Sequence, residues 1–251
     1  MLFRFLFVFF IVGFISAQNP YEKGSPLVTS LSSAQYGGEE QNFGFIQDEK
    51  GVLYVTNTIG FLEFNGATWR HFKPDNDGVP ISIAKDENGR IFSGGTSLIG
   101  YLEEDDRGQM QYKSLTHLLP KSFNLEFVWF TICHKQKVYF LNLDNVLVYD
   151  GTSIKIIESP HFNNSMFLFN DYIVIDTSHG LYRLENDQMI FIEGTEILGK
   201  PDVRALFGDS FKNFNGLARG LGLFEYQNNT AKRVDSKFSD FLLNKTVFNG
   251  T

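Results

Sequence analysis

The sequence predicts an all-β fold built from repeated four-stranded units, on three observations. Short runs of β-branched and aromatic residues recur throughout the chain, separated by clusters of Gly, Asn and Asp. Segments with the spacing of an amphipathic helix are scarce. The runs return with a period of about 40 residues, which is the period of the blades of a β-propeller.

The first two units share a skeleton that can be followed residue by residue. An apolar strand ends in Asp, a two-residue spacer and a Gly follow, and two further strands and a weaker fourth complete the unit. Asp48 and Asp86 are placed to accept hydrogen bonds from backbone N–H groups two residues on, and Gly51 and Gly89 can adopt positive φ. The strands are expected at 42–48, 52–56, 60–64 and 67–72, and then at 80–86, 90–93, 100–103 and 110–113.

Three later units keep the phase of the first two but lose part of the skeleton. The third and fourth units lack the Asp-x-x-Gly turn, so their assignment depends on phase alone. A meandering β-sandwich is the alternative reading of such a pattern. The third strands begin at Gly60, Gly100, Asn145, Gly180 and Gly222, at spacings of 40, 45, 35 and 42 residues.

A sixth unit is expected to begin as a strand near 239–243 and to reach 245–248. The prediction is therefore a β-propeller over 36–251, with about five four-stranded blades plus the start of a sixth, in an incomplete ring. A half-built sheet exposes an unpaired edge, which proteins normally avoid. We expect the sequence to be a fragment of a longer protein; the alternative is that another chain supplies the last strands.

The N-terminus has the pattern of a secretory signal peptide. Residues 1–17 contain Arg4, an apolar run, and a small residue before the expected cleavage at Gln18. The alternative is an uncleaved N-terminal anchor. A lead-in segment over 18–35 then precedes the propeller. We expect the mature chain to be exported.

Composition limits the classes of function that remain open to this chain. The formal net charge is −7, and a net acidic chain with dispersed charges does not attract nucleic acid. Cys133 is the only cysteine, so no intrachain disulfide can form, and its apolar neighbours favour a small buried side chain over a catalytic thiol.

The first unit also resembles a known family. Gly24-Ser-Pro-Leu-Val28, Tyr36-Gly-Gly38, the Asp48–Gly51 turn and Gly60 to Gly66 followed by Trp69 resemble the opening of regulators built from two-component-regulator propeller repeats. The repeat pattern resembles that family over 22–250, but the motifs are specific only over about 24–101 and 215–226.

In that family two periplasmic propellers precede an immunoglobulin-like triple-tyrosine module, a transmembrane helix and a histidine kinase or helix-turn-helix output. The resemblance implies a ligand-binding sensor propeller on the periplasmic side of a Gram-negative cell envelope, with dimerisation possible in the complete receptor. The membrane span and the output domain are not recognisable in this sequence. The implied partner is a small polar ligand, such as an oligosaccharide.

Ligands of propellers usually bind at the mouth of the central channel, which is lined by the loops before each first strand and between the second and third strands. These loops supply amides, hydroxyls and charges of both signs, and Trp129 could stack on a sugar ring. The strongest candidates are Gln41, Asn57, Asp77, Glu126, Trp129, Asp144, His179, Arg204 and Arg219, in a wider set with Asn42, Thr96, Asn124, Asn142 and Asn164.

No catalytic residue, metal ligand or cofactor is predicted. The histidines show no paired metal spacing, and the motifs of hydrolases and phosphate-binding loops do not occur. Two other functions remain open. One is a protein-interaction scaffold, and the other is a polysaccharide hydrolase or lyase, for which Asp77, Glu126 and Asp144 are the candidate acids.

Overall fold

The computed structural model describes residues 28–198, 202–243 and 245. The chain divides into two compact units, Met1–Leu31 and Ser32–Thr251. The predicted signal peptide over 1–17 lies outside the described residues, as do 246–251 of the expected sixth unit. Among the residues that the structure describes, no helix combines the length and apolar character needed to cross a membrane.

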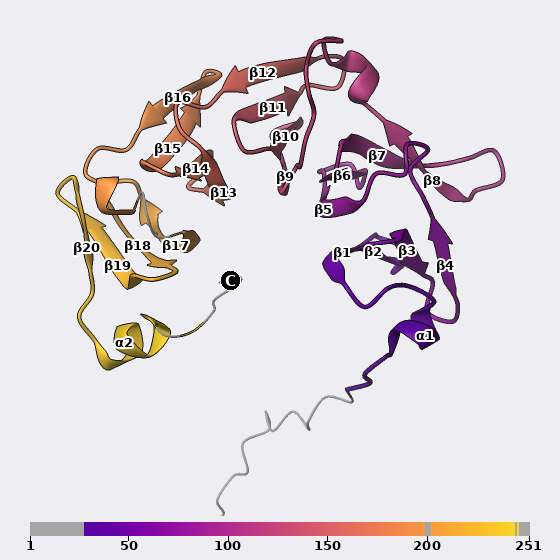
Figure 1. Cartoon of the computed structure of the whole chain (residues 1–251), viewed down its shortest axis with the longest axis horizontal. Coiled ribbons are helices and arrows are strands. Elements are labelled where there is room, and N and C mark those ends of the chain that lie inside the picture. The colour runs from indigo at the N-terminus through magenta and orange to yellow at the C-terminus, as the bar shows by residue number, and fades with distance from the viewer. Residues whose placement is uncertain (1–27, 199–201, 244, 246–251) are drawn as a thin grey trace, which may run out of the picture. The chain divides into compact units, whose positions relative to one another are not determined.

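The second unit contains five antiparallel sheets of four strands each, and every sheet follows chain order (Figure 1). We call these sheets blades 1 to 5. The first strands are β1 (Asn42–Gln47), β5 (Pro80–Lys85), β9 (Phe130–His134), β13 (Asn163–Phe169) and β17 (Val203–Ser210). The second strands are β2 (Leu53–Asn57), β6 (Ile91–Gly95), β10 (Lys137–Leu141), β14 (Tyr172–Thr177) and β18 (Asn213–Ala218).

The third and fourth strands complete each blade. The third strands are β3 (Gly60–Phe64), β7 (Leu98–Glu104), β11 (Asn145–Tyr149), β15 (Gly180–Glu185) and β19 (Gly222–Gln227). The fourth strands are β4 (Trp69–Phe72), β8 (Met110–Ser114), β12 (Ile154–Glu158), β16 (Gln188–Phe191) and β20 (Thr230–Arg233). The first strand of each blade contacts the first strand of the next, from β1 to β17. The predicted propeller blades are therefore confirmed.

Most of the hydrophobic core lies between blades, and one further cluster packs Tyr36 against Val55 and Leu62 of blade 1. Tyr54 and Phe61 of blade 1 pack with Ile91 and Leu102 of blade 2 in a single cluster. Equivalent clusters join blade 2 to blade 3, blade 3 to blade 4, and blade 4 to blade 5. The alternating apolar residues of each strand thus bury their surface against a neighbouring sheet.

Polar side chains also join neighbouring blades. The Thr56 hydroxyl of β2 donates to the Ile81 carbonyl of β5 at 3.1 Å, so it connects blade 1 to blade 2. Between blades 4 and 5, the Ser165 hydroxyl donates to the Val203 carbonyl at 3.0 Å. These bonds help to fix the spacing of neighbouring blades.

The Asp-x-x-Gly turns have the predicted chemistry. The Asp48 carboxylate accepts hydrogen bonds from the backbone N–H groups of Lys50 and Val52, at 2.9 and 2.8 Å. Gly51 has φ +85°, a conformation that other residues adopt with strain. A third turn of this kind, at Asp105, was not predicted. Blades 3 and 4, which lack the motif, use two-residue turns with positive φ instead, such as Lys135–Gln136.

Replacing Asp48 with Ala is expected to lower the free energy of unfolding by about 1 kcal/mol, because two backbone donors lose their acceptor. Urea unfolding followed by circular dichroism measures this change. Asp106→Ala is the matched control, since Asp106 is exposed and the substitution changes the net charge equally. Equal losses in the two variants would contradict the assigned role of the turn.

Beyond blade 5, the prediction that a sixth blade starts with a strand is wrong. Residues expected to form a strand near 239–243 belong to helix α2 (Lys237–Leu243). The Ser236 hydroxyl accepts from the Ser239 N–H at 3.1 Å, and the Ser236 carbonyl accepts from the Asp240 N–H at 3.0 Å. Ser236 is thus the start signal of the helix. Phe238 and Phe241, three residues apart, have the spacing of one helix face. The short helix α1 (Ser33–Tyr36) similarly precedes blade 1.

Candidate functional site

The first strands of four blades carry a β-bulge near their beginning, and two of these bulges position polar side chains. The register shifts between Asn163 and Ser165 in β13, and between Val203 and Ala205 in β17. The extra residues are Asn164 and Arg204. Because a bulge leaves one residue outside the ladder, it redirects that side chain. The corresponding shifts in β1 and β5 leave Phe43 and Ile81 at this place.

A pocket of about 300 Å³ opens at the beginnings of β9, β13 and β17. We call it the blade 3–5 pocket, and its lining residues are Trp129, Phe130, Asn163, Asn164, Asp202 and Arg204. It thus combines aromatic surface with amides and charges of both signs. Of the residues predicted from the sequence, Trp129, Arg204 and Asn164 meet here.

Trp129 provides a flat apolar surface at this pocket. Its side chain is 49% exposed, although its backbone N–H is held by the Leu141 carbonyl at 2.9 Å. The indole stacks against Phe127, with ring centroids 5.3 Å apart and planes inclined by 11°. An exposed aromatic ring that is held in place can accept the apolar face of a ligand at low entropic cost.

The charged part of the site is a shared carboxylate. Asp202 Oδ2 lies 2.6 Å from Arg204 Nη2 and 3.5 Å from Arg219 Nη1. The Arg204 side chain is 19% exposed and that of Arg219 is 43% exposed. Each guanidinium group has five N–H donors, so the contact with Asp202 leaves donors for a ligand.

Asp176, in β14, is fully buried, with 0% exposure. Its Oδ2 accepts from the Val203 N–H at 3.1 Å and from Asn164 Nδ2 at 3.2 Å, so it joins blade 4 to blade 5. Burial raises the pKa of Asp176 from its ordinary 3.8 to about 8, against the lowering effect of these two hydrogen bonds; Asp202 raises it and Arg204 lowers it. The group is therefore mostly neutral at pH 7.

Three buried polar atoms around the pocket have no protein partner among the described residues. They are Asn163 Oδ1, Asp176 Oδ1 and Arg204 Nε. Each such atom costs stability of about 1–3 kcal/mol unless another molecule satisfies it. Their concentration at one place favours a functional role for the pocket over a purely structural one.

The remaining predicted residues lie at other places. Asp144 lines a second pocket of about 290 Å³ with His161 and Phe162, and His179 stacks on His161 with ring centroids 4.5 Å apart. Gln41, Asp77 and Glu126 are exposed on separate loops. Asp144 therefore lies at a different pocket from Trp129 and Arg204. The loops of Asp77 and Glu126 both contact Ser97, through Asn76 Nδ2 at 2.9 Å and through the Glu126 carbonyl at 2.8 Å.

Asn57 has a structural position. It is fully buried, and its Oδ1 accepts from the N–H groups of Glu39 and Ile59, both at 3.1 Å. Its Nδ2 donates to the Glu39 and Gln41 carbonyls, at 2.7 and 3.0 Å. All its hydrogen-bonding groups are used within blade 1, so none is free for a ligand.

Sequence reasoning missed Asp176 and Asp202. The available signal for Asp176 was an acidic residue at the end of the apolar run Tyr172–Ile175, a position that ordinarily leads into a solvated turn. Its burial depends on the neighbouring blade. Asp202 was overlooked although it lies two residues before Arg204.

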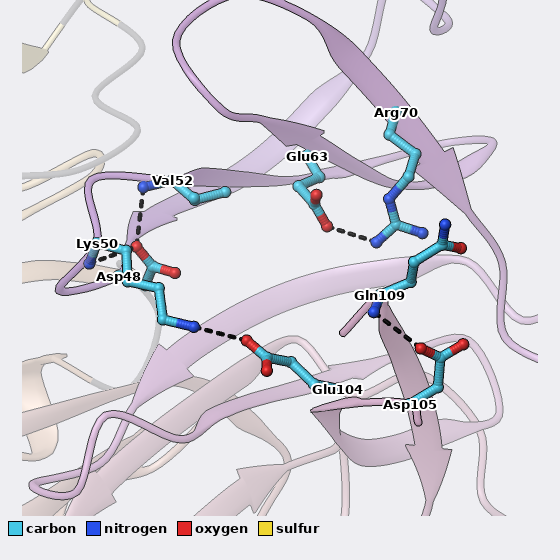
Figure 2. Close-up of polar contacts among 8 residues, drawn as sticks. All are labelled: Asp48, Lys50, Val52, Glu63, Arg70, Glu104, Asp105 and Gln109. Atoms are coloured by element: carbon cyan, nitrogen blue, oxygen red, sulfur yellow. Dashed lines mark hydrogen bonds and ion pairs between the residues drawn. The ribbon is translucent and has the colours of Figure 1, made fainter. Parts of the chain in front are cut away.

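A second polar cluster lies between blades 1 and 2, where the turn after β1 and strands β3 and β4 of blade 1 meet the turn between β7 and β8 of blade 2 (Figure 2). Lys50 Nζ contacts Glu104 at 2.7 Å, and Arg70 contacts Glu63 at 2.5 Å. The carboxylates of Asp48 and Asp105 accept from backbone N–H groups (Figure 2). Since each of these acids already has a protein partner, we interpret the cluster as structural.

Two further chemical features bear on function. Among the described residues, no group of three or more His, Cys, Asp or Glu side chains is arranged to hold a metal ion. Burial, with a smaller contribution from Asp86, raises the pKa of Cys133 to about 12. That thiol is therefore protonated at neutral pH and poorly suited to act as a nucleophile.

Comparison with solved structures defines the class of fold. The extracellular domain of the one component system BT4673 from B. thetaiotaomicron matches with a TM-score of 0.57 at 15% identity, over 79% of this chain and 28% of that one. Virginiamycin B lyase from Staphylococcus aureus matches with a TM-score of 0.58 at 13% identity, over 78% of this chain and 70% of that one. PorZ, a surface component of the type-IX secretion system of Porphyromonas gingivalis, matches with a TM-score of 0.58 at 13% identity, over 86% of this chain and 36% of that one.

These similarities show that the chain has the β-propeller fold, and it resembles in structure an extracellular domain of a signalling system. The chain spans only 28% of the BT4673 domain and 36% of PorZ. No protein-family model matches the chain, and no curated protein matches its sequence.

Proposed function

We propose that this chain is part of the ligand-binding propeller of an exported sensor, and that it binds a polar ligand in the blade 3–5 pocket. The observation that carries the proposal is the pocket itself, where Trp129, Asn164 and Arg204 meet above buried polar atoms without protein partners. The structural resemblance to an extracellular domain of a signalling system supports the sensory part. The apolar N-terminal run over 1–17 supports export to the periplasmic side.

We further propose an oligosaccharide as the ligand. A sugar ring has an apolar face that fits an exposed aromatic ring, and hydroxyl groups that both donate and accept hydrogen bonds. The pocket offers Trp129 for the first and the amides of Asn163 and Asn164, with Arg204, for the second. In the complete receptor, occupancy would be transmitted by segments outside this chain.

Replacing Trp129 with Ala is expected to weaken oligosaccharide binding by about tenfold or more, because the aromatic contact is lost. Isothermal titration calorimetry with a panel of neutral and acidic oligosaccharides measures the affinity, and tryptophan fluorescence reports contact with the pocket. Trp69→Phe is the matched control, since Trp69 stacks on Phe64 in blade 1, with centroids 4.6 Å apart. If no member of the panel binds, or if Trp129→Ala binds normally, the proposal is wrong.

A further inference from the structure

The charges at the blade 3–5 pocket have the opposite sign to the chain as a whole. The chain carries a formal net charge of −7. Arg204, which lines the pocket, and its neighbour Arg219 share a single carboxylate, that of Asp202, which also lines the pocket. The other acid, Asp176, is buried and mostly protonated at pH 7. The net charge of this group of side chains is therefore positive in an otherwise acidic protein.

From this arrangement, and resting on the function proposed above, we propose that the ligand is an acidic saccharide whose carboxylate is bound between Arg204 and Arg219 while its ring lies on Trp129. Asp202 holds both guanidinium groups through the same oxygen. The hydrogen bond at 2.6 Å orients Arg204 before the ligand arrives, and the longer contact at 3.5 Å draws Arg219 toward the same carboxylate. Less side-chain entropy is then lost on binding. Arginine is well suited to this role because its planar fork matches a carboxylate.

The arrangement discriminates against other ligands. A cationic ligand would meet two guanidinium groups and only one carboxylate that is already shared. A neutral saccharide would satisfy the amides and stack on Trp129, but it would leave the charge of the arginine pair uncompensated. Desolvating that charge without a partner is costly. Selectivity for an anion therefore follows from the charges rather than from the shape of the pocket.

Asp176 makes this selectivity depend on pH. The charged groups facing it are Asp202 and Arg204, and its Oδ2 bonds both Asn164 and the first strand of blade 5. When Asp176 ionises as the pH rises through about 8, its negative charge cancels the local positive balance. The affinity for an acidic saccharide is then expected to fall several-fold between pH 7 and pH 9, and Asp176→Asn should remove most of that fall.

The test uses the whole chain and three matched pairs of probes: trimers of galacturonate, glucuronate and mannuronate, each as the free acid and as its neutral methyl ester. Calorimetry at pH 7 is expected to show that at least one free acid binds about tenfold or more tightly than its ester. This preference should shrink as NaCl screens the charges.

Arg219→Gln is expected to weaken binding of the acid by about 10- to 100-fold while leaving the affinity for the ester nearly unchanged. Arg219 is exposed, so the variant should fold; Arg204→Gln provides a second substitution at the same pair. Arg107→Gln, in the turn of Asp105 to Gly108, is the charge-matched control and should bind normally.

The outcomes separate this inference from the proposed function. If esters or neutral oligosaccharides bind as tightly as acids, and Trp129→Ala abolishes that binding, the acidic ligand is excluded and the oligosaccharide sensor remains. If none of the three free acids binds although neutral members of the panel do, the inference is likewise overturned. If no saccharide of any kind binds, both proposals fail.

Discussion

Replacing Asp176 with Asn is expected to stabilise the folded protein at pH 7–8, by on the order of 3 kcal/mol, and to flatten the dependence of its stability on pH. The reason is the difference between the folded pKa of about 8 and the ordinary value of 3.8. Below pH 3.8 the carboxyl is protonated in both states and no penalty arises. Between the two values only the unfolded chain ionises, so the free energy of unfolding falls as the pH rises, and above about 8 the penalty is constant.

The measurement is urea unfolding of the original protein and the variant at intervals from pH 4 to pH 9. Asn preserves an oxygen acceptor for the Val203 N–H, so the packing of blades 4 and 5 should survive. Asp106→Asn is the control, because Asp106 is exposed. A stability difference between the original protein and Asp176→Asn that stays constant from pH 5 to pH 8 would contradict the raised pKa.

Replacing Asn57 with Ala is expected to lower the free energy of unfolding by about 3 kcal/mol. The change leaves the N–H groups of Glu39 and Ile59 and the carbonyls of Glu39 and Gln41 without their buried partner. Unsatisfied buried groups cost about 1–3 kcal/mol each, and part of this loss is recovered where the loop over 39–41 can reach water.

Thermal and urea unfolding measure this loss, and Thr58→Ala serves as the neighbouring control because Thr58 is exposed. We expect the control to change the free energy of unfolding by about 0.5 kcal/mol or less. A loss below about 1 kcal/mol for Asn57→Ala would show that the four hydrogen bonds named above are not needed to hold the loop.

The fold was largely predictable because its signals are local. The Asp48 and Asp86 turns combine an acceptor, a spacer and a glycine within four residues, and the structure realises both. Blades 3 and 4 were predictable only from the spacing of their strands, because their two-residue turns have a less specific sequence than the Asp-x-x-Gly turn. The segment at 239–243 was misread because its apolar residues also fit a strand, whereas Ser236 as a helix start decides for α2.

The site was predictable only in part, because it depends on contacts between blades. Trp129 and Arg204 could be placed by their position at the beginning of a first strand, and the structure brings both to one pocket. The companion rule, which takes the loop between the second and third strands, also selected Asn57, although its amide is used internally. Asp176 could not be recognised, since its burial and its raised pKa arise from the first strand of the next blade, which is distant in sequence.

The position of the core between the blades means that each blade is stabilised by its neighbours. The blade 3–5 pocket is lined by residues at the beginnings of β9, β13 and β17, so a ligand bound there would contact three successive blades at once. Because opening any one of these blades would break contacts with the ligand, binding should raise the free energy of local opening in all three.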